Sequence, residues 1–275
     1  MKRKISISLI LVLALVTMSF AMVSADDPVA EVYVGHGIPG GALDLPDELP
    51  VDVLVNDAIC LLEAFEFGEF AGPVELEADI YNIKISLADL DDPCSGDPVI
   101  EADVPFESGV NYTVFAHLTE EGAPTASLFV NDVDSAVAGY TRLTVRHTAF
   151  APAVDIELYR GWERGRMVGE IEGLENPDQA GPLDIRPGGY EAVILAAGTD
   201  VEVFGLQVEL EPHKSYIVYA VGGLDTETFT VLAQVIELGM VPPPRPVPPI
   251  PPWMPELPEL PELPELPGPP QLPFP

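Results

Sequence analysis

A short pattern that occurs twice constrains the fold of this chain more than any other feature. Residues 143–158, LTVRHTAFAPAVDIEL, place a proline-containing turn between two stretches that alternate apolar and polar residues, and VYVGH from Val32 with LPVDVLV from Leu49 is a weaker upstream copy. Side chains of a β-strand point alternately to opposite faces. The alternation therefore predicts half-buried strands, with Val154 facing a core and Asp155 facing water.

Further short β-rich stretches punctuated by Gly, Pro, Asn and Asp follow along the chain about every ten residues. Helical periodicity is not convincing anywhere. Many short strands at this spacing favour an antiparallel sandwich or barrel. The additional strands that we expect are residues 51–56, 80–87, 99–104, 111–118, 126–130 and 154–159.

The second half of the chain repeats the order of the first. The spacing between matching residues leaves about one hundred residues per copy, the size of an immunoglobulin-like domain. We therefore predict an all-β protein with two tandem immunoglobulin-like antiparallel β-sandwich domains, residues 26–138 and 139–240. The matching pairs are His36 with His147, Asp52 with Asp155, Ala71-Gly72-Pro73 with Ala180-Gly181-Pro182, Tyr81 with Tyr190, and residues 111–116 with 215–220.

The first 25 residues are typical of a secretory signal peptide. A basic start, MKRK, precedes an uncharged apolar stretch and the small residues before Ala25, after which we expect cleavage. The apolar stretch approaches spanning length, so an uncleaved membrane anchor is the alternative. We expect the mature protein to be secreted or held at the cell surface.

The last 35 residues, 241–275, contain 17 of the 31 prolines. This composition cannot pack a core and favours a disordered, polyproline II tail. The repeated triplet Pro-Glu-Leu from Pro255 places leucines on one side of such a helix. The tail is interpreted as a stiff acidic spacer, with a docking strip for a partner as the alternative.

The charge of the chain is strongly negative. The sequence has 45 acidic and 12 basic residues, and loss of Lys2, Arg3 and Lys4 with the signal peptide leaves a net charge of −36. Residues 26–138 alone have 25 acidic residues against Lys84. Such a surface repels phosphate backbones and anionic lipid, so nucleic acid and anionic membrane surfaces are poor partners.

Two cysteines remain after the signal peptide, Cys60 and Cys94. In an exported protein an even pair predicts one disulfide. A redox or metal pair is less consistent with the sequence, because the spacing is not that of a Cys-x-x-Cys motif.

The repeated turn residues His36, Asp52, His147 and Asp155 are the most notable polar positions. They are interpreted mainly as structural, with each imidazole bonding turn backbone and each Asp closing the following strand. A ligand-contacting or proton-transfer role is the alternative. Calcium, the one cofactor considered, prefers oxygen ligands. Two acidic clusters could supply them, although neither has EF-hand spacing and a solvated acidic turn is the simpler interpretation: Asp89, Asp91 and Asp92, and Asp132 and Asp134.

No sequence motif indicates catalysis. Serine-nucleophile and zinc-protease motifs are absent, and carboxylates are too abundant for any pair to be singled out as glycosidase residues. Asn111-Tyr112-Thr113 is a glycosylation sequon within a predicted strand. Trp162 lies near a turn, where an aromatic ring could stack on a sugar.

These residues resemble a secreted bacterial and archaeal family, the domain of unknown function numbered 4397. The similarity lies in the strand ending in His before a proline turn (VRHTAFAPAVDI), the Ala-Gly-Pro-to-Tyr segment, and the strand NYTVFAHL with its counterpart in the second half. The first copy departs in its turn, GIPGGALDLPDELP, which is longer. The resemblance spans residues 29–238 as two copies and implies an exported β-sandwich module, without an agreed activity.

Together these observations predict an exported, non-catalytic binding or structural module of the cell exterior. Recognition would use the turns 36–50 and 147–153, and the partner would be a cell-envelope glycan or protein. A secreted hydrolase of polysaccharide or peptide and a calcium-stabilised acidic stalk are the alternatives.

Overall fold

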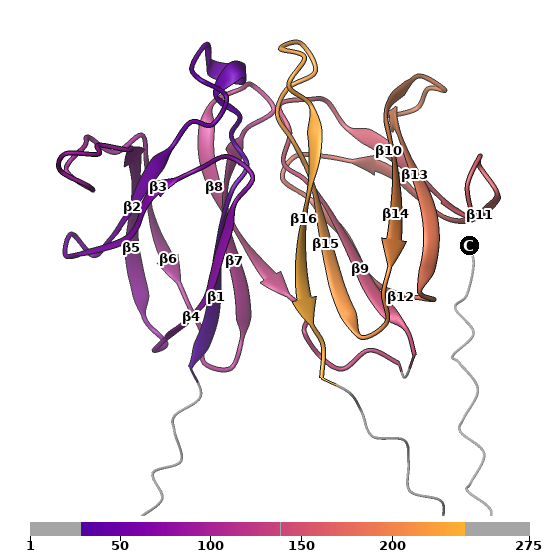
Figure 1. Ribbon diagram of the computed structural model, residues 1–275, viewed down its shortest axis with the longest axis horizontal. Helices are drawn as coiled ribbons and strands as arrows, with labels where there is room; N and C mark the ends of the chain where they lie inside the picture. Colours follow the sequence, from indigo (N-terminus) through magenta and orange to yellow (C-terminus); the bar gives the residue numbers. More distant parts are fainter. Residues whose placement is uncertain (1–28, 138, 240–275) are drawn as a thin grey trace, which may run out of the picture. The chain divides into compact units, whose positions relative to one another are not determined.

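A computed structural model describes residues 29–137 and 139–239, whose strands form two sets with the same topology (Figure 1). Repeat 1 (residues 29–137) contains β1 (Ala30–His36), the 3-10 helix η1 (Gly40–Leu43), β2 (Val51–Val55), β3 (Ile59–Phe65), β4 (Phe70–Leu76), β5 (Ile80–Leu87), β6 (Ile100–Pro105), β7 (Asn111–Leu118) and β8 (Pro124–Asn131). Repeat 2 (residues 139–239) contains β9 (Thr141–His147), β10 (Val154–Arg160), β11 (Arg166–Leu174), β12 (Gln179–Ile185), β13 (Gly188–Ala196), β14 (Glu202–Leu210), β15 (Lys214–Val221) and β16 (Thr230–Glu237).

Each repeat consists of two four-stranded sheets that enclose an apolar core. Repeat 1 has the strand orders β4-β1-β7-β8 and β3-β2-β5-β6, and repeat 2 has β12-β9-β15-β16 and β11-β10-β13-β14. The second pair of orders reproduces the first strand for strand, so the predicted tandem β-sandwich fold is confirmed. The pairing is antiparallel except where β1 lies parallel to β7 and β9 lies parallel to β15.

The repeated Ala-Gly-Pro segments lie within strands β4 and β12, where the register against the neighbouring strand shifts. Gly72 has φ +117° and Gly181 has φ +104°, and a Cβ at these positions would lie 2.7 Å from the Val32 carbonyl oxygen and 2.8 Å from that of Leu143. Only glycine tolerates both this dihedral and this close approach. The segment recurs because both edge strands contain the same bulge.

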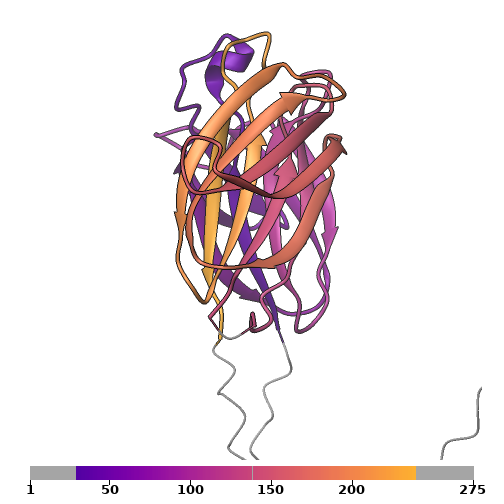
Figure 2. The ribbon, with the colours of Figure 1, turned by 90° about the vertical axis from the view of Figure 1, so that its right-hand side faces the viewer.

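The two repeats pack against each other through the sheets that contain β7 and β15. Every residue of β7 is buried. Val114 faces the core of repeat 1, whereas Phe115 packs in a separate cluster with Ile217 and Tyr219 of repeat 2, and its ring centroid lies 4.1 Å from that of Tyr219. Because both faces of β7 are covered, the repeats form one compact unit (Figures 1 and 2).

A buried arginine joins the repeats at this contact. Arg146 of β9 is fully buried and donates hydrogen bonds to the Val130 carbonyl oxygen (3.1 Å) and to Asn131 Oδ1 (2.9 Å) of repeat 1. Within repeat 2 it donates to Gln179 Oε1 (3.0 Å) and the Tyr219 hydroxyl (2.5 Å). Burial lowers the pKa of this guanidinium, which nonetheless stays charged in proteins. The guanidinium of Arg146 thus has neutral oxygens as its hydrogen-bond acceptors inside the interface.

The predicted signal peptide and proline-rich tail lie outside the described residues. Within residues 29–137 and 139–239, no helix has the length and apolar character needed to cross a bilayer.

Candidate functional site

The two repeated histidines lie at equivalent places and make equivalent hydrogen bonds. His36 Nε2 donates to the Leu49 carbonyl oxygen at 2.9 Å, and His147 Nε2 donates to that of Pro152, also at 2.9 Å. On the other side of each ring, Nδ1 accepts a backbone N–H two residues further on, at 3.3 Å in both repeats. Each imidazole therefore spans the turn between the first two strands of its repeat.

These rings are buried, and burial favours their neutral form. Desolvation lowers the pKa of His36 and of His147, outweighing the hydrogen bonds to turn carbonyls, which raise it. A third histidine, His117 of β7, lies in the same part of the unit, and desolvation lowers its pKa to about 4. All three rings are neutral at pH 7.

The two repeated aspartates also make equivalent contacts, each linking its own strand to the neighbouring strand and to one loop. Asp52 Oδ1 accepts the Ala64 N–H at 2.9 Å, and its other oxygen accepts those of Asp89 and Cys94. Asp155 accepts the N–H groups of Gly173 and Gly198, both at 2.7 Å. These hydrogen bonds lower the pKa of the Asp155 carboxyl.

The structure does not join the repeated histidine to the repeated aspartate through a hydrogen bond. The ring nitrogens of His147 contact the Pro152 and Ala149 backbone, whereas Asp155 accepts backbone N–H groups from β11 and from the loop after β13. The proton-transfer alternative requires a direct bond between base and orienting carboxylate. The described hydrogen bonds instead hold turns in place.

The acidic clusters considered for calcium are placed differently from each other. Asp89 Oδ1 accepts the N–H groups of Asp91 and Asp92, so it caps its own turn. Asp132 forms an ion pair with Arg142, and its Oδ1 also accepts the Asp134 N–H. Among the described residues, no group of three or more His, Cys, Asp or Glu side chains is arranged to hold a metal ion.

Three other predicted positions can be located. Cys60 and Cys94 form the expected disulfide, with an S–S distance of 2.03 Å. Asn111 is 4% exposed, and its amide nitrogen donates to Glu31 Oε2 at 2.8 Å, so the sequon is not accessible in the folded chain. Trp162 is exposed and contacts the backbone of Gly189.

Loops from both repeats meet at the end of the unit opposite the points where the described chain begins and stops (Figure 1). We call this surface the loop end, and it comprises residues 37–50 and 119–123 of repeat 1 and 148–153, 175–178 and 222–229 of repeat 2.

Specific contacts connect the loops of the two repeats. The Asn176 amide donates to the Leu118 carbonyl oxygen at 2.9 Å and to that of Ala149 at 2.6 Å. Phe150 packs against the core of repeat 1, and a Cβ on Gly122 would lie 3.1 Å from its ring. The loop end is therefore one surface built jointly by both repeats.

The loop end is acidic. Its five loops contain no lysine or arginine. Exposed carboxylates come from both repeats, including Asp44 and Glu120 of repeat 1 and Asp225 and Glu227 of repeat 2. Like charges on neighbouring loops add to a negative potential over the surface, which attracts cationic groups.

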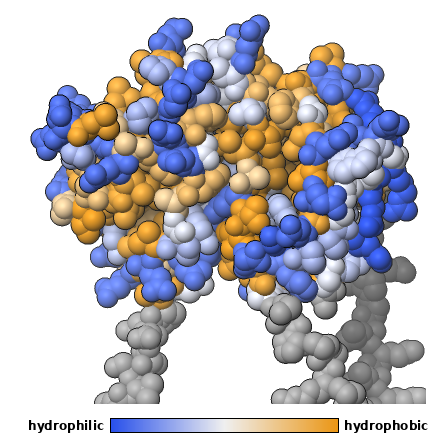
Figure 3. Space-filling model, in the orientation of Figure 1, coloured by the Kyte–Doolittle hydropathy of each residue, from blue (hydrophilic) through white to orange (hydrophobic). Residues whose placement is uncertain are grey.

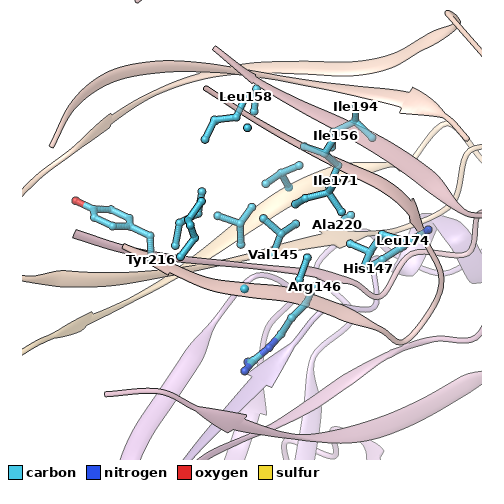
Figure 4. Close-up of a pocket in the computed structure, with 18 of the residues that line it drawn as sticks. Val145, Arg146, His147, Ile156, Leu158, Ile171, Leu174, Ile194, Tyr216 and Ala220 are labelled. Atoms are coloured by element: carbon cyan, nitrogen blue, oxygen red, sulfur yellow. The ribbon is translucent and has the colours of Figure 1, made fainter. Parts of the chain in front are cut away.

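A second feature is a cavity of about 370 Å³ between the two sheets of repeat 2 (Figure 4). All eight strands of the repeat contribute to its lining, which is almost entirely apolar. Glu170 is the one carboxylate among the described residues that line it. A glycosidase cleft needs two facing carboxylates, so this cavity does not fit the hydrolase alternative.

The cavity and the burial of Arg146 were not predicted from the sequence. Alternation shows which residues of a strand share a face, but it does not show how well the facing sheets fill the space between them. The signal that could have found the cavity is a loss of side-chain volume in the second copy. Val218 pairs with Ala233 on β16, whereas at the equivalent place in repeat 1 Val114 pairs with Leu128 on β8.

Comparison with solved structures gives only distant likenesses. The Bacillus anthracis TIE protein is 12% identical with a TM-score of 0.22; the match covers 70% of this chain and 33% of that chain, so the chain spans about a third of its length. A streptococcal virulence factor described for alpha-glucan binding is 10% identical over 74% of this chain and 96% of its own, with a TM-score of 0.22. A candidate cell adhesion protein from Bacteroides fragilis is 11% identical over 78% and 99%, with a TM-score of 0.18. Because the TM-scores are this low, neither the fold nor the ligand of these proteins is assigned to this chain.

No curated protein sequence matches the chain. One family does match, and it extends from the first residue of β1 through all of repeat 1 into β10. Membership of residues beyond 157 in the same family stays a prediction, although their strand order repeats that of repeat 1. The resemblance predicted from the sequence is confirmed for residues 30–157, which match the family described as domain of unknown function, DUF4397.

Proposed function

We propose that the chain is an exported, non-catalytic binding protein of the cell exterior whose loop end recognises a cationic partner. The observation that carries this proposal is the joint construction of the loop end. Asn176 bonds the backbone of both repeats, and Phe150 of repeat 2 packs on repeat 1. Two independently moving modules would hold their loops at variable distances, whereas these contacts fix the loops in one arrangement.

A fixed arrangement favours binding because less conformational freedom is lost when a partner docks. The turn hydrogen bonds of His36 and His147 extend this order into the loops themselves. In this proposal the repeated histidines contribute to recognition only by shaping the loops. The aspartates Asp52 and Asp155 act similarly, because each fastens a neighbouring loop to its strand.

The charge of the loop end defines the partner chemistry. With carboxylates from both repeats and no basic residue in its loops, the surface complements an envelope protein or glycan that carries cationic groups. Nucleic acid and anionic membrane would be repelled. The N-terminal signal predicted from the sequence supports the location, since it would deliver the chain to the exterior.

The test measures binding of the immobilised mature chain to cell-envelope proteins and glycans over a series of salt concentrations. Neutralising exposed loop-end carboxylates should weaken binding severalfold and flatten its salt dependence, because screening acts on those charges. The loop variant combines Asp44→Asn, Glu120→Gln and Asp225→Asn.

A matched control neutralises three exposed carboxylates of repeat 1 outside the loop end, through Glu63→Gln, Glu75→Gln and Glu77→Gln. It should bind as the unaltered chain does. Equal weakening in both variants would indicate only an effect of net charge and would refute recognition by the loop end. Turnover of a captured glycan or peptide would refute the non-catalytic assignment.

A further inference from the structure

We propose that the cavity of repeat 2 is a binding site for a slender hydrocarbon chain, such as the acyl or prenyl part of a lipid. The space lies between two sheets, whose separation in sandwiches is about 10 Å. A volume of about 370 Å³ is within the usual range of ligand sites. A flat, apolar space of this kind accepts a chain lying between the sheets.

The buried polar side chains in the lining are already bonded elsewhere, and the one carboxylate, Glu170, is exposed to solvent. Figure 4 shows Arg146 directed away from the cavity, toward the strands of repeat 1, where it has its hydrogen bonds. The Tyr216 hydroxyl accepts the Glu211 N–H at 3.0 Å, and both ring nitrogens of His147 are bonded to turn backbone. A polar group of a ligand would therefore be buried without a partner, which is costly. The buried part of the ligand must be apolar.

Two residues that line the cavity are smaller than their equivalents in repeat 1, although Leu206, which pairs with one of them, is larger than its own equivalent, Ala102. On β13, Ala192 occupies the position of Ile83 on β5, and on β16, Ala233 occupies the position of Leu128 on β8. The core of repeat 1 is a single cluster, whereas buried apolar residues of repeat 2 form three separate clusters around the cavity. Protein interiors are normally close-packed, so a space of this size calls for an occupant.

The edges of the sandwich offer an entrance. Ala233 lines the cavity and is nevertheless exposed, which places an opening at the edge strands β14 and β16. At the opposite edge, Leu183 of β12 lines the cavity and is 49% exposed. Figure 3 shows hydrophobic residues on the surface over the middle of β16. A chain can enter lengthwise while its polar head stays in water.

The test titrates the mature full-length protein with cis-parinaric acid, a fluorescent fatty acid, and follows its displacement by a fatty acid, the matching alcohol, a prenyl alcohol and a plain alkane. We expect saturable binding of one probe per chain. Displacement by the acid, alcohol and alkane alike identifies the hydrocarbon as the recognised part. Comparing the prenyl alcohol with the straight-chain alcohol distinguishes a prenyl ligand from an acyl ligand. Failure of the alkane to compete would overturn recognition of the hydrocarbon itself.

The decisive variant gives repeat 2 the residues of repeat 1, Ala192→Ile with Ala233→Leu. Filling the cavity should weaken probe binding about tenfold or more while the melting temperature stays or rises. A matched control makes the same changes at exposed alanines outside the cavity and the loop end, Ala78→Ile with Ala58→Leu, and should bind normally.

Two other results would refute binding of the hydrocarbon in the cavity. Absence of probe binding to the unaltered protein would mean that the cavity is only loosely packed core. Undiminished binding by the filled variant would place the probe elsewhere. If the double variant does not fold, Ala233→Leu alone, at an exposed position on an edge strand, serves in its place, and it should weaken binding in the same direction.

Discussion

Replacing His117 with glutamine should remove part of the acid sensitivity of the folded protein. The ring of His117 is 1% exposed, Nδ1 donates to the Leu118 carbonyl oxygen at 2.9 Å, and Nε2 accepts the Ser127 hydroxyl at 2.8 Å. Both nitrogens are therefore satisfied in the neutral ring. Protonation would add a buried charge and remove the acceptor for Ser127, which is why desolvation, assisted by nearby His147, lowers the pKa from 6.5 to about 4.

The sign and size of the effect follow from this shift. Below pH 6.5 the unfolded chain binds a proton at His117, whereas the folded chain does not bind it until the pH approaches 4. The contribution of His117 to the free energy of unfolding is therefore fully present above pH 6.5 and is lost as the pH falls toward 4. At about 1.4 kcal/mol per pKa unit, the loss is about 2 kcal/mol at pH 5 and about 3 kcal/mol near pH 4.

Urea unfolding at several pH values between 7.5 and 4 measures this contribution. His117→Gln should be less stable than the unaltered protein at pH 7.5, and the difference should shrink by about 2 kcal/mol at pH 5. The control His213→Gln removes a partly exposed histidine and should retain the pH dependence of the unaltered protein. A difference between His117→Gln and the unaltered protein that is constant from pH 7.5 to 5 would refute the argument.

Three further predictions concern contacts that stabilise the fold. Arg146→Lys should lower the free energy of unfolding by about 2–4 kcal/mol, since an ammonium cannot reach Asn131 and the other three acceptors together; a loss below about 1 kcal/mol in urea unfolding would contradict this. Cys60→Ser should cost about 3–4 kcal/mol relative to the oxidised protein, and reduction should then have no further effect on its stability. Gly181→Ala should destabilise by at least about 2 kcal/mol in thermal unfolding, because the new methyl group would meet the Leu143 carbonyl at a positive φ; an unchanged melting temperature would show that β12 can shift without cost.

Period-two alternation was sufficient to predict the strands that are half-buried. Val154 and Ile156 of β10 face the core of repeat 2 as that alternation predicted, whereas the strand at 111–118, which has the expected bounds, is buried on both faces. The repeated His, Asp and Tyr residues also allowed the tandem fold to be predicted. Their contacts show why they recur: Tyr81 and Tyr190 each donate to a carbonyl four residues earlier, which fastens equivalent turns.

What the sequence alone determined is about half of the strands, their duplication and the disulfide, because these depend on local alternation, spacing and residue type. The tertiary structure decided three other properties: the packing of the repeats on each other, the burial of Arg146 between them, and the cavity of repeat 2. Each depends on which surface covers the second face of a sheet and how completely side chains from distant strands fill the space between sheets. Alternation marks Phe115 and Val114 as lying on opposite faces of β7, but only the folded chain places Tyr219 against the first and the core of repeat 1 against the second.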